Sequence, residues 1–301
     1  MLPNFLIGGA AAAGTSFLSA SVTQHPEIYL PEKLEPEPHF FYKSWEYEKG
    51  AKYYETNWFS SVKNEKAIGE RSSSYLFGGT EVAKKIKALL PDAKLIFVLR
   101  NPIERTWANY RFTVLNGLED LPFKDALRNE KNRIAKQSGK WAEIQPHNYT
   151  GRGFYARQLK EYLRFFPAKN ILLIKSEDMG SAPQEAFRKV FDFLEVDKNY
   201  IPSVPSNFTS LSVKDPARQM YFRKYFGDRF ARIIEAIRKD KDPLAYLQDG
   251  TEKKTLLELM DNLKGVKEET GKEERAYLQD FFQDDMNELK ELVKFSIEDW
   301  R

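Results

Sequence analysis

The apolar residues of this chain follow two alternating patterns. Short, nearly unbroken apolar runs are typical of parallel strands that are buried on both faces, and they occupy residues 3–8, 94–100 and 170–178. Weaker extended segments are expected at residues 27–31 and 66–77. Between these runs apolar residues recur at helical spacing, which predicts helices at about residues 14–24, 46–59 and 81–90, from 103 onward, and at 151–167.

This alternation predicts an α/β fold with a mainly parallel central sheet and helices on both faces. The proline-rich segment 31–41 is expected to be a loop. The chain from about residue 215 is predicted to be helical, and we interpret residues 245–275 as a charged helical insertion. The length suits one large α/β domain, so we expect residues 1–301 to form a single domain.

The composition excludes several classes of site. Without cysteine there are no disulfides, thiolate metal sites or cysteine nucleophiles, and three histidines give no metal-ligand pattern. A net charge of +3 provides no broad basic field, so we expect no nucleic-acid partner. Residues 1–26 carry no Asp, Glu, Lys or Arg. They lack the positive start of a signal peptide and hold too many polar and glycine residues for a spanning helix, so we expect a cytoplasmic protein without a transmembrane segment.

The stretch FLIGGAAAAGTSFLSA, residues 5–20, predicts a buried strand, a glycine-bounded loop and a helix. Such a loop can hold a phosphate group on its backbone N–H groups and on the helix N-terminus. Thr15 stands where the Walker A lysine would be, which disfavours an ATPase or a nucleotide kinase, and the G-x-G-x-x-G fingerprint is missing. A tight turn without any ligand is the alternative interpretation.

A second anion-binding candidate follows the buried strand 94–100. Arg100 stands at the carboxyl end of this strand, where open α/β sheets bind their ligands. Arg105 and Arg111 come next, on a predicted helix, and taken singly we interpret them as surface charges.

Together these segments resemble the sulfotransferases that use 3′-phosphoadenosine 5′-phosphosulfate (PAPS), in particular the bacterial and heparan-sulfate-type branch. FLIGGAAAAGTSFL resembles the 5′-phosphosulfate loop, and KLIFVLRNPIERTWANYRF resembles the 3′-phosphate segment. HPEIYLP, EPHFF, AIGERSSSYL, GRGFYARQL, ILLIKSED and FSIEDW occur in the order of the family. The resemblance implies a P-loop-like sulfotransferase fold that binds PAPS, or the product 3′-phosphoadenosine 5′-phosphate (PAP), through Ala11, Ala13, Gly14, Thr15, Ser16, Arg100, Ala108 and Asn109.

The chain departs from the family pattern at two of these positions. Ala12 replaces a loop lysine that would stabilise charge on the leaving phosphate, and Ala108 replaces a serine on the 3′-phosphate. Asn109 could substitute in part for that serine. These losses affect catalysis more than the fold, so a nucleotide-binding pseudoenzyme is the alternative function. Whether Ala12 is a natural or an introduced residue stays open, as does the oligomeric state.

The resemblance also implies an acceptor site. Transfer to a hydroxyl needs a base opposite the leaving phosphate. The resemblance places this base at Glu37, in Glu37-Pro38-His39, with His39 as the alternative. It places Lys33 and Arg71 near the acceptor or the sulfuryl group, and Arg71 could supply part of the missing positive charge. Phe41 belongs to an aromatic cluster beside Glu37. Such residues are more often core residues, and lining an apolar acceptor cleft is the alternative interpretation. The expected acceptor is a small molecule, lipid or carbohydrate with a hydroxyl group, and the reaction needs no metal.

Overall fold

A computed structural model of the chain describes residues 1–31, 36–204, 211–265 and 269–300. The chain divides into two compact units, which we describe separately. Unit 1 comprises Met1–Arg105, Gly151–Pro205 and Gln279–Arg301, and unit 2 comprises Thr106–Thr150 and Ser206–Leu278.

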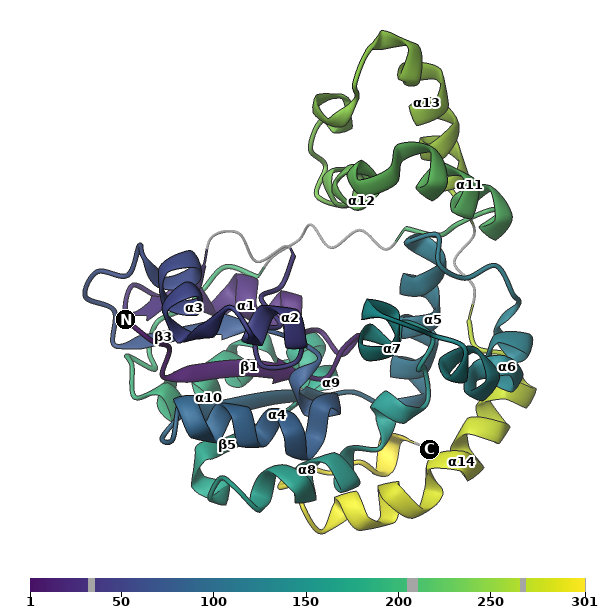
Figure 1. Cartoon of the computed structure of the whole chain (residues 1–301). Coiled ribbons are helices and arrows are strands. Elements are labelled where there is room, and N and C mark those ends of the chain that lie inside the picture. The colour runs from purple at the N-terminus through teal and green to yellow at the C-terminus, as the bar shows by residue number, and fades with distance from the viewer. Residues whose placement is uncertain (32–35, 205–210, 266–268, 301) are drawn as a thin grey trace. The chain divides into compact units, whose positions relative to one another are not determined.

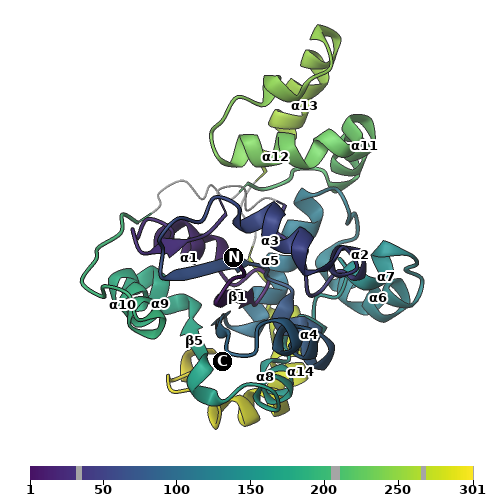
Figure 2. The same cartoon turned by 60° about the vertical axis from the view of Figure 1, so that its left-hand side comes forward.

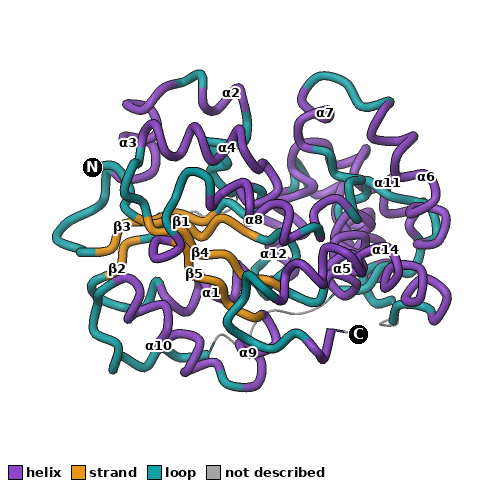
Figure 3. The backbone as a smooth tube through the Cα atoms, turned by 90° about the horizontal axis from the view of Figure 1, so that it is seen from below, coloured by secondary structure: helices purple, strands orange, loops and turns teal. Residues whose placement is uncertain are grey.

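Unit 1 contains a parallel β-sheet (Figures 1 and 3). Within the described residues it has five strands in the order β2-β3-β1-β4-β5. Their bounds are β1 Phe5–Gly9, β2 Ile28–Tyr29, β3 Ala67–Arg71, β4 Lys94–Leu99 and β5 Ile171–Lys175. In the parallel register Leu6 lies opposite both Glu70 and Leu95. The carboxyl ends of β1, β3 and β4 therefore lie at one edge of the sheet, where the loop of residues 10–14, Ser72 and Arg100 follow the three strands.

Helices cover both faces of this sheet, as Figure 3 shows. One face carries α1 Thr15–Val22, α9 Ser176–Ser181 and α10 Pro183–Leu194. The other carries α2 Ser44–Tyr47, α3 Gly50–Phe59, α4 Tyr75–Leu89 and α8 Tyr155–Leu163. The predicted α/β fold with a mainly parallel sheet is thus confirmed.

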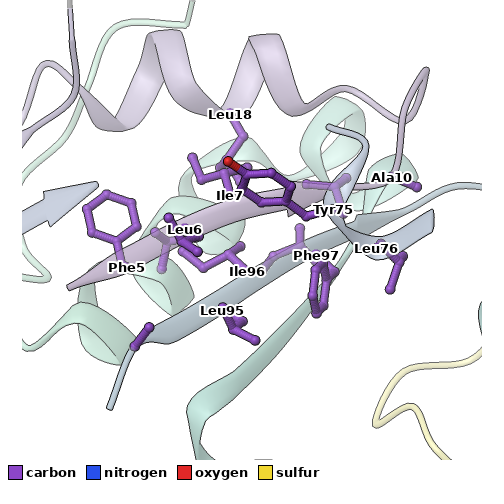
Figure 4. Close-up of a cluster of buried hydrophobic side chains, with 14 of the residues drawn as sticks. Phe5, Leu6, Ile7, Ala10, Leu18, Tyr75, Leu76, Leu95, Ile96 and Phe97 are labelled. Carbon is purple, nitrogen blue, oxygen red and sulfur yellow. The ribbon is translucent and has the colours of Figure 1, made fainter. Parts of the chain in front are cut away.

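The core of unit 1 lies between the sheet and these helices (Figure 4). Phe5, Leu6, Ile7, Leu95, Ile96 and Phe97 of β1 and β4 are all at most 1% exposed. Apolar residues on both sides of a strand are what two covering layers of helices require. Gly69 of β3 leaves room for Phe5, because a Cβ atom at this position would lie 2.4 Å from the Phe5 ring.

Unit 2 is helical in its described residues (Figure 2). It contains α6 Phe123–Ala135, α7 Lys140–Ile144, α11 Pro216–Phe226, α12 Phe230–Arg238 and α13 Lys253–Asn262. Helices α5 Pro102–Leu115 and α14 Lys272–Lys290 each have residues in both units. Phe222, Phe226, Phe230, Leu256 and Leu259 form a core. Part of the predicted charged insertion, residues 245–275, thus contributes buried side chains, while its status as an insertion in one domain stays a prediction.

Three predicted element boundaries were wrong. The extended segment expected at 66–77 ends at Arg71, and helix α4 begins at Tyr75 rather than near residue 81. The helix expected at 46–59 is two helices, α2 and α3, and Gly50 at the start of α3 has a φ of 81°. In the described part of the chain, no helix has the length and apolar content that crossing a membrane requires.

Candidate functional site

The phosphate loop, residues 10–14, connects strand β1 to helix α1. Gly14 precedes α1 with a φ of 99°, and a Cβ atom there would lie 2.9 Å from the Cε atom of Met179. Within the described residues the backbone N–H groups of Gly14, Thr15 and Ser16 donate no hydrogen bond. These free donors stand at the positive end of a helix dipole, so the loop can bind an anion. The Thr15 side chain is buried, and Ser16 is partly exposed.

Two arginines contact the carbonyl groups of this loop. Arg100 Nη1 donates to the Ala12 carbonyl oxygen at 3.4 Å, and Arg105 Nη1 donates to the Ala11 carbonyl oxygen at the same distance. Arg105 is 0% exposed, so its interpretation as a surface charge was wrong. The error arose because spacing along a helix does not reveal which face a loop covers.

Glu37 lies in a cluster of hydrogen-bond donors that come from the end of β3. Arg71 Nη1 donates to Glu37 Oε1, while the backbone N–H and the hydroxyl of Ser73 donate to Oε2 at 2.7 and 2.8 Å. Arg71 Nη1 also donates to Ser16 Oγ at 2.9 Å. Arg71 thereby links the candidate base to the first turn of α1. Burial raises the pKa of Glu37, but Arg71 and the bonds from Ser73 outweigh it, and the pKa lies below its ordinary value.

His39 lies beside this carboxylate, with its Nε2 atom 3.2 Å from Glu37 Oε2. Burial lowers the pKa of His39 to about 4, and the positive charges of Lys43, Arg152 and Arg71 lower it too. The negative charge of Glu37 acts in the opposite direction and does not outweigh them. At neutral pH the imidazole is therefore uncharged. The site then combines an ionised carboxylate, a neutral imidazole and a guanidinium group, which is a set that can accept a proton and stabilise negative charge.

The structure brings together only some of the predicted site residues. Phe41 is 0% exposed and packs on Tyr54 and Tyr75, so it is a core residue and does not line an acceptor cleft. Lys33 lies outside the described residues. Ala108 and Asn109 belong to unit 2, so their role toward the 3′-phosphate stays a prediction. Among the described residues no group of three or more His, Asp or Glu could hold a metal ion.

Our sequence reasoning missed two contributors to the site. Ser73 bonds Glu37 twice, and Arg152 places its guanidinium over the Phe77 ring at 4.3 Å while it acts on the His39 pKa. The three serines 72–74 between a buried strand and a helix could have signalled hydrogen-bonding work at the sheet edge. No sequence feature pointed to Arg152 beyond its place in GRGFYARQL.

The chain is similar in sequence to known sulfotransferases. Mouse heparan sulfate glucosamine 3-O-sulfotransferase 3B1 (Mus musculus) is 32% identical over 193 residues, which are 64% of this chain and 46% of that protein. The human heparan sulfate glucosamine 3-O-sulfotransferase 6 (Homo sapiens) is 30% identical over 241 residues, 78% of this chain and 66% of that protein. The chain spans about half the length of the first of these relatives.

A solved structure and a family description complete the comparison. The crystal structure of a sulfotransferase from Alicyclobacillus acidocaldarius matches with a TM-score of 0.72 at 25% identity, over 100% of this chain and 99% of that chain. The family model described as "Sulfotransferase domain" matches residues 2–242. This match includes the phosphate loop, Glu37, Arg71 and Arg100, and the chain therefore belongs to the sulfotransferase domain family.

Proposed function

We propose that this chain transfers a sulfuryl group from PAPS to a hydroxyl group of a carbohydrate. The proposal is carried by two hydrogen bonds of Arg71. This arginine donates one to Glu37 and one to Ser16. One guanidinium group thus joins the candidate base to the first turn of α1, directly after the phosphate loop. This arrangement suits an in-line transfer, in which the base and the leaving phosphate lie on opposite sides of the transferred group.

The phosphate loop has the chemistry that the 5′-phosphosulfate end of PAPS requires. The N–H groups of Gly14, Thr15 and Ser16 have no partner within the described residues and would donate to its oxygens. We assign Arg100 to the 3′-phosphate, and Ala108 and Asn109 remain further proposals for that group. When bound, the donor supplies an electrophilic sulfuryl group with a nucleotide phosphate as its leaving group.

Glu37 is the residue that we assign as the base. Its lowered pKa keeps the carboxylate ionised at neutral pH, so it can accept the proton of the acceptor hydroxyl. His39 is neutral in the same range, and its Nε2 atom lies within reach of Glu37. We assign His39 the role of orienting Glu37, because Arg71 donates its hydrogen bond to Glu37.

A carbohydrate hydroxyl is the acceptor that the relatives favour. Their names describe sulfotransferases that act on heparan sulfate glucosamine. A small molecule or a lipid with a hydroxyl group is the alternative acceptor, and the cytoplasmic location stays a prediction.

Single-turnover transfer from radiolabelled PAPS tests this function. Heparan-sulfate oligosaccharides, lipids and phenols serve as acceptors, and the expected product is a sulfated oligosaccharide. Glu37→Gln should lower transfer by roughly 10²–10⁴-fold, the usual contribution of a general base. Its affinity for PAP, measured by calorimetry, should stay nearly unchanged.

Two results would contradict these assignments. If no acceptor that binds receives label, the proposed activity is wrong. If His39→Ala abolishes transfer and Glu37→Gln does not, the base is His39.

A further inference from the structure

The segment that carries the candidate base, residues 37–41, is held by a run of residues at the end of β3 and the start of α4. Arg71 and Ser73 bind the Glu37 carboxylate. The next contact is to the backbone, since His39 N–H donates to Ser72 Oγ at 2.7 Å. His39 has a φ of 47°, a left-handed conformation that non-glycine residues seldom adopt, so the segment depends on such external bonds to keep its shape.

Glu70 is the member of this run that the proposed reaction does not use. Its side chain is 0% exposed, and its Oε1 atom accepts hydrogen bonds from Tyr75 Oη at 2.6 Å and from Tyr54 Oη at 3.1 Å. Burying a carboxyl group is costly even when it has hydrogen-bond partners, and an apolar residue would fill the same space without that cost. A role for this carboxyl group beyond packing would account for its presence.

The Tyr75 hydroxyl connects Glu70 to the backbone of segment 37–41. A tyrosine hydroxyl has one proton and two lone pairs. Because Tyr75 donates its proton to Glu70, its oxygen is left to accept the N–H of Phe41, which lies 3.4 Å away. Glu70 therefore sets the direction in which this hydroxyl offers its lone pairs.

Ring contacts strengthen the same connection. Phe41 packs edge-on against both Tyr75 and Tyr54, with ring centroids 5.6 and 5.5 Å apart, so the hydroxyl contacts and not the ring contacts separate the two tyrosines. Tyr54 stacks on Phe40 at 4.1 Å, and its hydroxyl bonds Glu70 but makes no hydrogen bond to the backbone of the described residues 37–41. The two tyrosines thus share a partner in Glu70, and only Tyr75 passes its effect to the Phe41 amide.

We propose that Glu70 is a positioning residue for the candidate base: by orienting the Tyr75 hydroxyl it fixes the Phe41 end of segment 37–41, and so holds Glu37 and His39 in place. The inference rests on the proposed function for its catalytic meaning. Its structural part concerns the apoprotein alone, which allows the two to be tested apart.

The apoprotein test uses the NMR signals of the His39 ring. The chain has three histidines, and assignment by single His→Gln variants identifies His39. Tyr75→Phe and Glu70→Leu should shift the His39 signals, because both remove the oriented acceptor of the Phe41 N–H. Glu70→Gln should restore them, because its amide oxygen still accepts from Tyr75. Tyr54→Phe is the matched control, since it removes a hydroxyl from the same oxygen of Glu70, and it should leave the His39 signals in place.

The catalytic test uses kcat and the affinity for PAP. Tyr75→Phe and Glu70→Leu should lower kcat by roughly 10–10²-fold, as expected for a misplaced catalytic group, with PAP affinity unchanged. Glu70→Gln and Tyr54→Phe should stay within about threefold of the parent chain, which is well below that effect. If Tyr54→Phe and Tyr75→Phe have equal effects on His39 and on kcat, or if Glu70→Gln behaves like Glu70→Leu, the inference is wrong.

If Tyr75→Phe does not fold, the comparison of Glu70→Gln with Glu70→Leu still tests whether Glu70 positions the candidate base. A failure of the proposed function would appear differently. Glu37→Gln would then have no effect on transfer, while the His39 signals would still report on the role of Glu70.

Discussion

Among single residues, we expect Ala12 to have the most direct consequence for the rate of transfer. Its carbonyl oxygen accepts a bond from Arg100, so the loop backbone is held, but an alanine side chain brings no charge to the leaving group. A cation at this position would act mainly on charge that develops in the transition state. We expect Ala12→Lys to raise single-turnover transfer by roughly 10²–10³-fold, the size of one preorganised donor, and to change PAP affinity much less.

Ala11→Lys is the matched control for this change. It places the same charge one residue away, in the same loop, where the carbonyl oxygen accepts from Arg105. Equal gains from both variants would indicate a general effect of positive charge rather than a specific lysine position. If the parent chain already transfers fast, Arg71 or Lys33 supplies the needed charge. If Ala12→Lys gives no transfer with an acceptor that is shown to bind, the chain is a nucleotide-binding pseudoenzyme.

The raised pKa of Glu70 should make the stability of the folded chain depend on pH. Burial, helped by the negative charge of Glu37, raises the pKa of Glu70 from 4.5 to about 7. Between these pH values the folded chain holds a proton that the unfolded chain releases, so the free energy of unfolding falls as pH rises through this range. Denaturant titrations at pH values from 4.5 to 8 measure this change. The free energy of unfolding should fall by about 3 kcal/mol more in the parent chain than in Glu70→Gln.

Glu37 should change the pH dependence of stability in the opposite direction. The pKa of Glu37 is lowered in the folded chain, so its ionised form contributes stability that is present above the ordinary pKa and is lost as pH falls. Glu37→Gln should therefore lose stability near neutral pH and approach the parent chain in acid. Parallel pH profiles for Glu70→Gln and the parent chain would contradict the raised pKa.

At the level of elements, the sequence was most informative where a strand ends in a loop. The apolar runs at β1, β4 and β5 predicted the sheet, because burial on both faces leaves an unbroken apolar pattern. The β3 region misled us, because Tyr75, Leu76 and Phe77 continue an apolar pattern after the strand has ended. These residues begin α4, in which Tyr75 and Leu76 are 0% exposed. Period alone does not separate a short strand from the first turn of a buried helix.

The contacts that build the site lie beyond what local pattern can predict. Arg71 meets Glu37 across 34 positions of the chain, and Ser73 meets it across 36. The sequence placed Arg100 at a strand end, because a strand's length and direction fix that position. It did not place Arg105, which is buried and donates to the Ala11 carbonyl oxygen of the loop of residues 10–14.

For the whole molecule, the family assignment and the division into units answer different questions. The family match runs from residue 2 to residue 242 and so includes parts of both units. Unit 1 alone contains the phosphate loop, Glu37, Arg71 and Arg100. The bonds that Arg71 makes to Glu37 and to Ser16 therefore lie within one compact unit. The parallel sheet of this unit positions the segments that make them.

Donor binding should stabilise the folded chain as a whole. A ligand at 100 times its Kd that binds only the folded form adds about 2.7 kcal/mol to the free energy of unfolding. We expect PAP to raise the Tm more than ADP does at equal concentration, because ADP lacks the 3′-phosphate that we assign to Arg100. A charge-assisted contact of this kind is worth about 1.5–3 kcal/mol, or roughly a 10–10²-fold difference in Kd.

Thermal unfolding with PAP, ADP and ATP with Mg²⁺ measures this preference. Arg100→Ala should remove the advantage of PAP over ADP, because we assign the N–H groups of Gly14, Thr15 and Ser16 to the 5′-phosphate group, which both nucleotides carry. Arg164→Ala is the matched control, since Arg164 is an exposed arginine of the same unit and should leave the advantage intact. Equal stabilisation by PAP and ADP in the parent chain, or a larger effect of ATP with Mg²⁺, would show that the loop holds a different nucleotide from the one proposed.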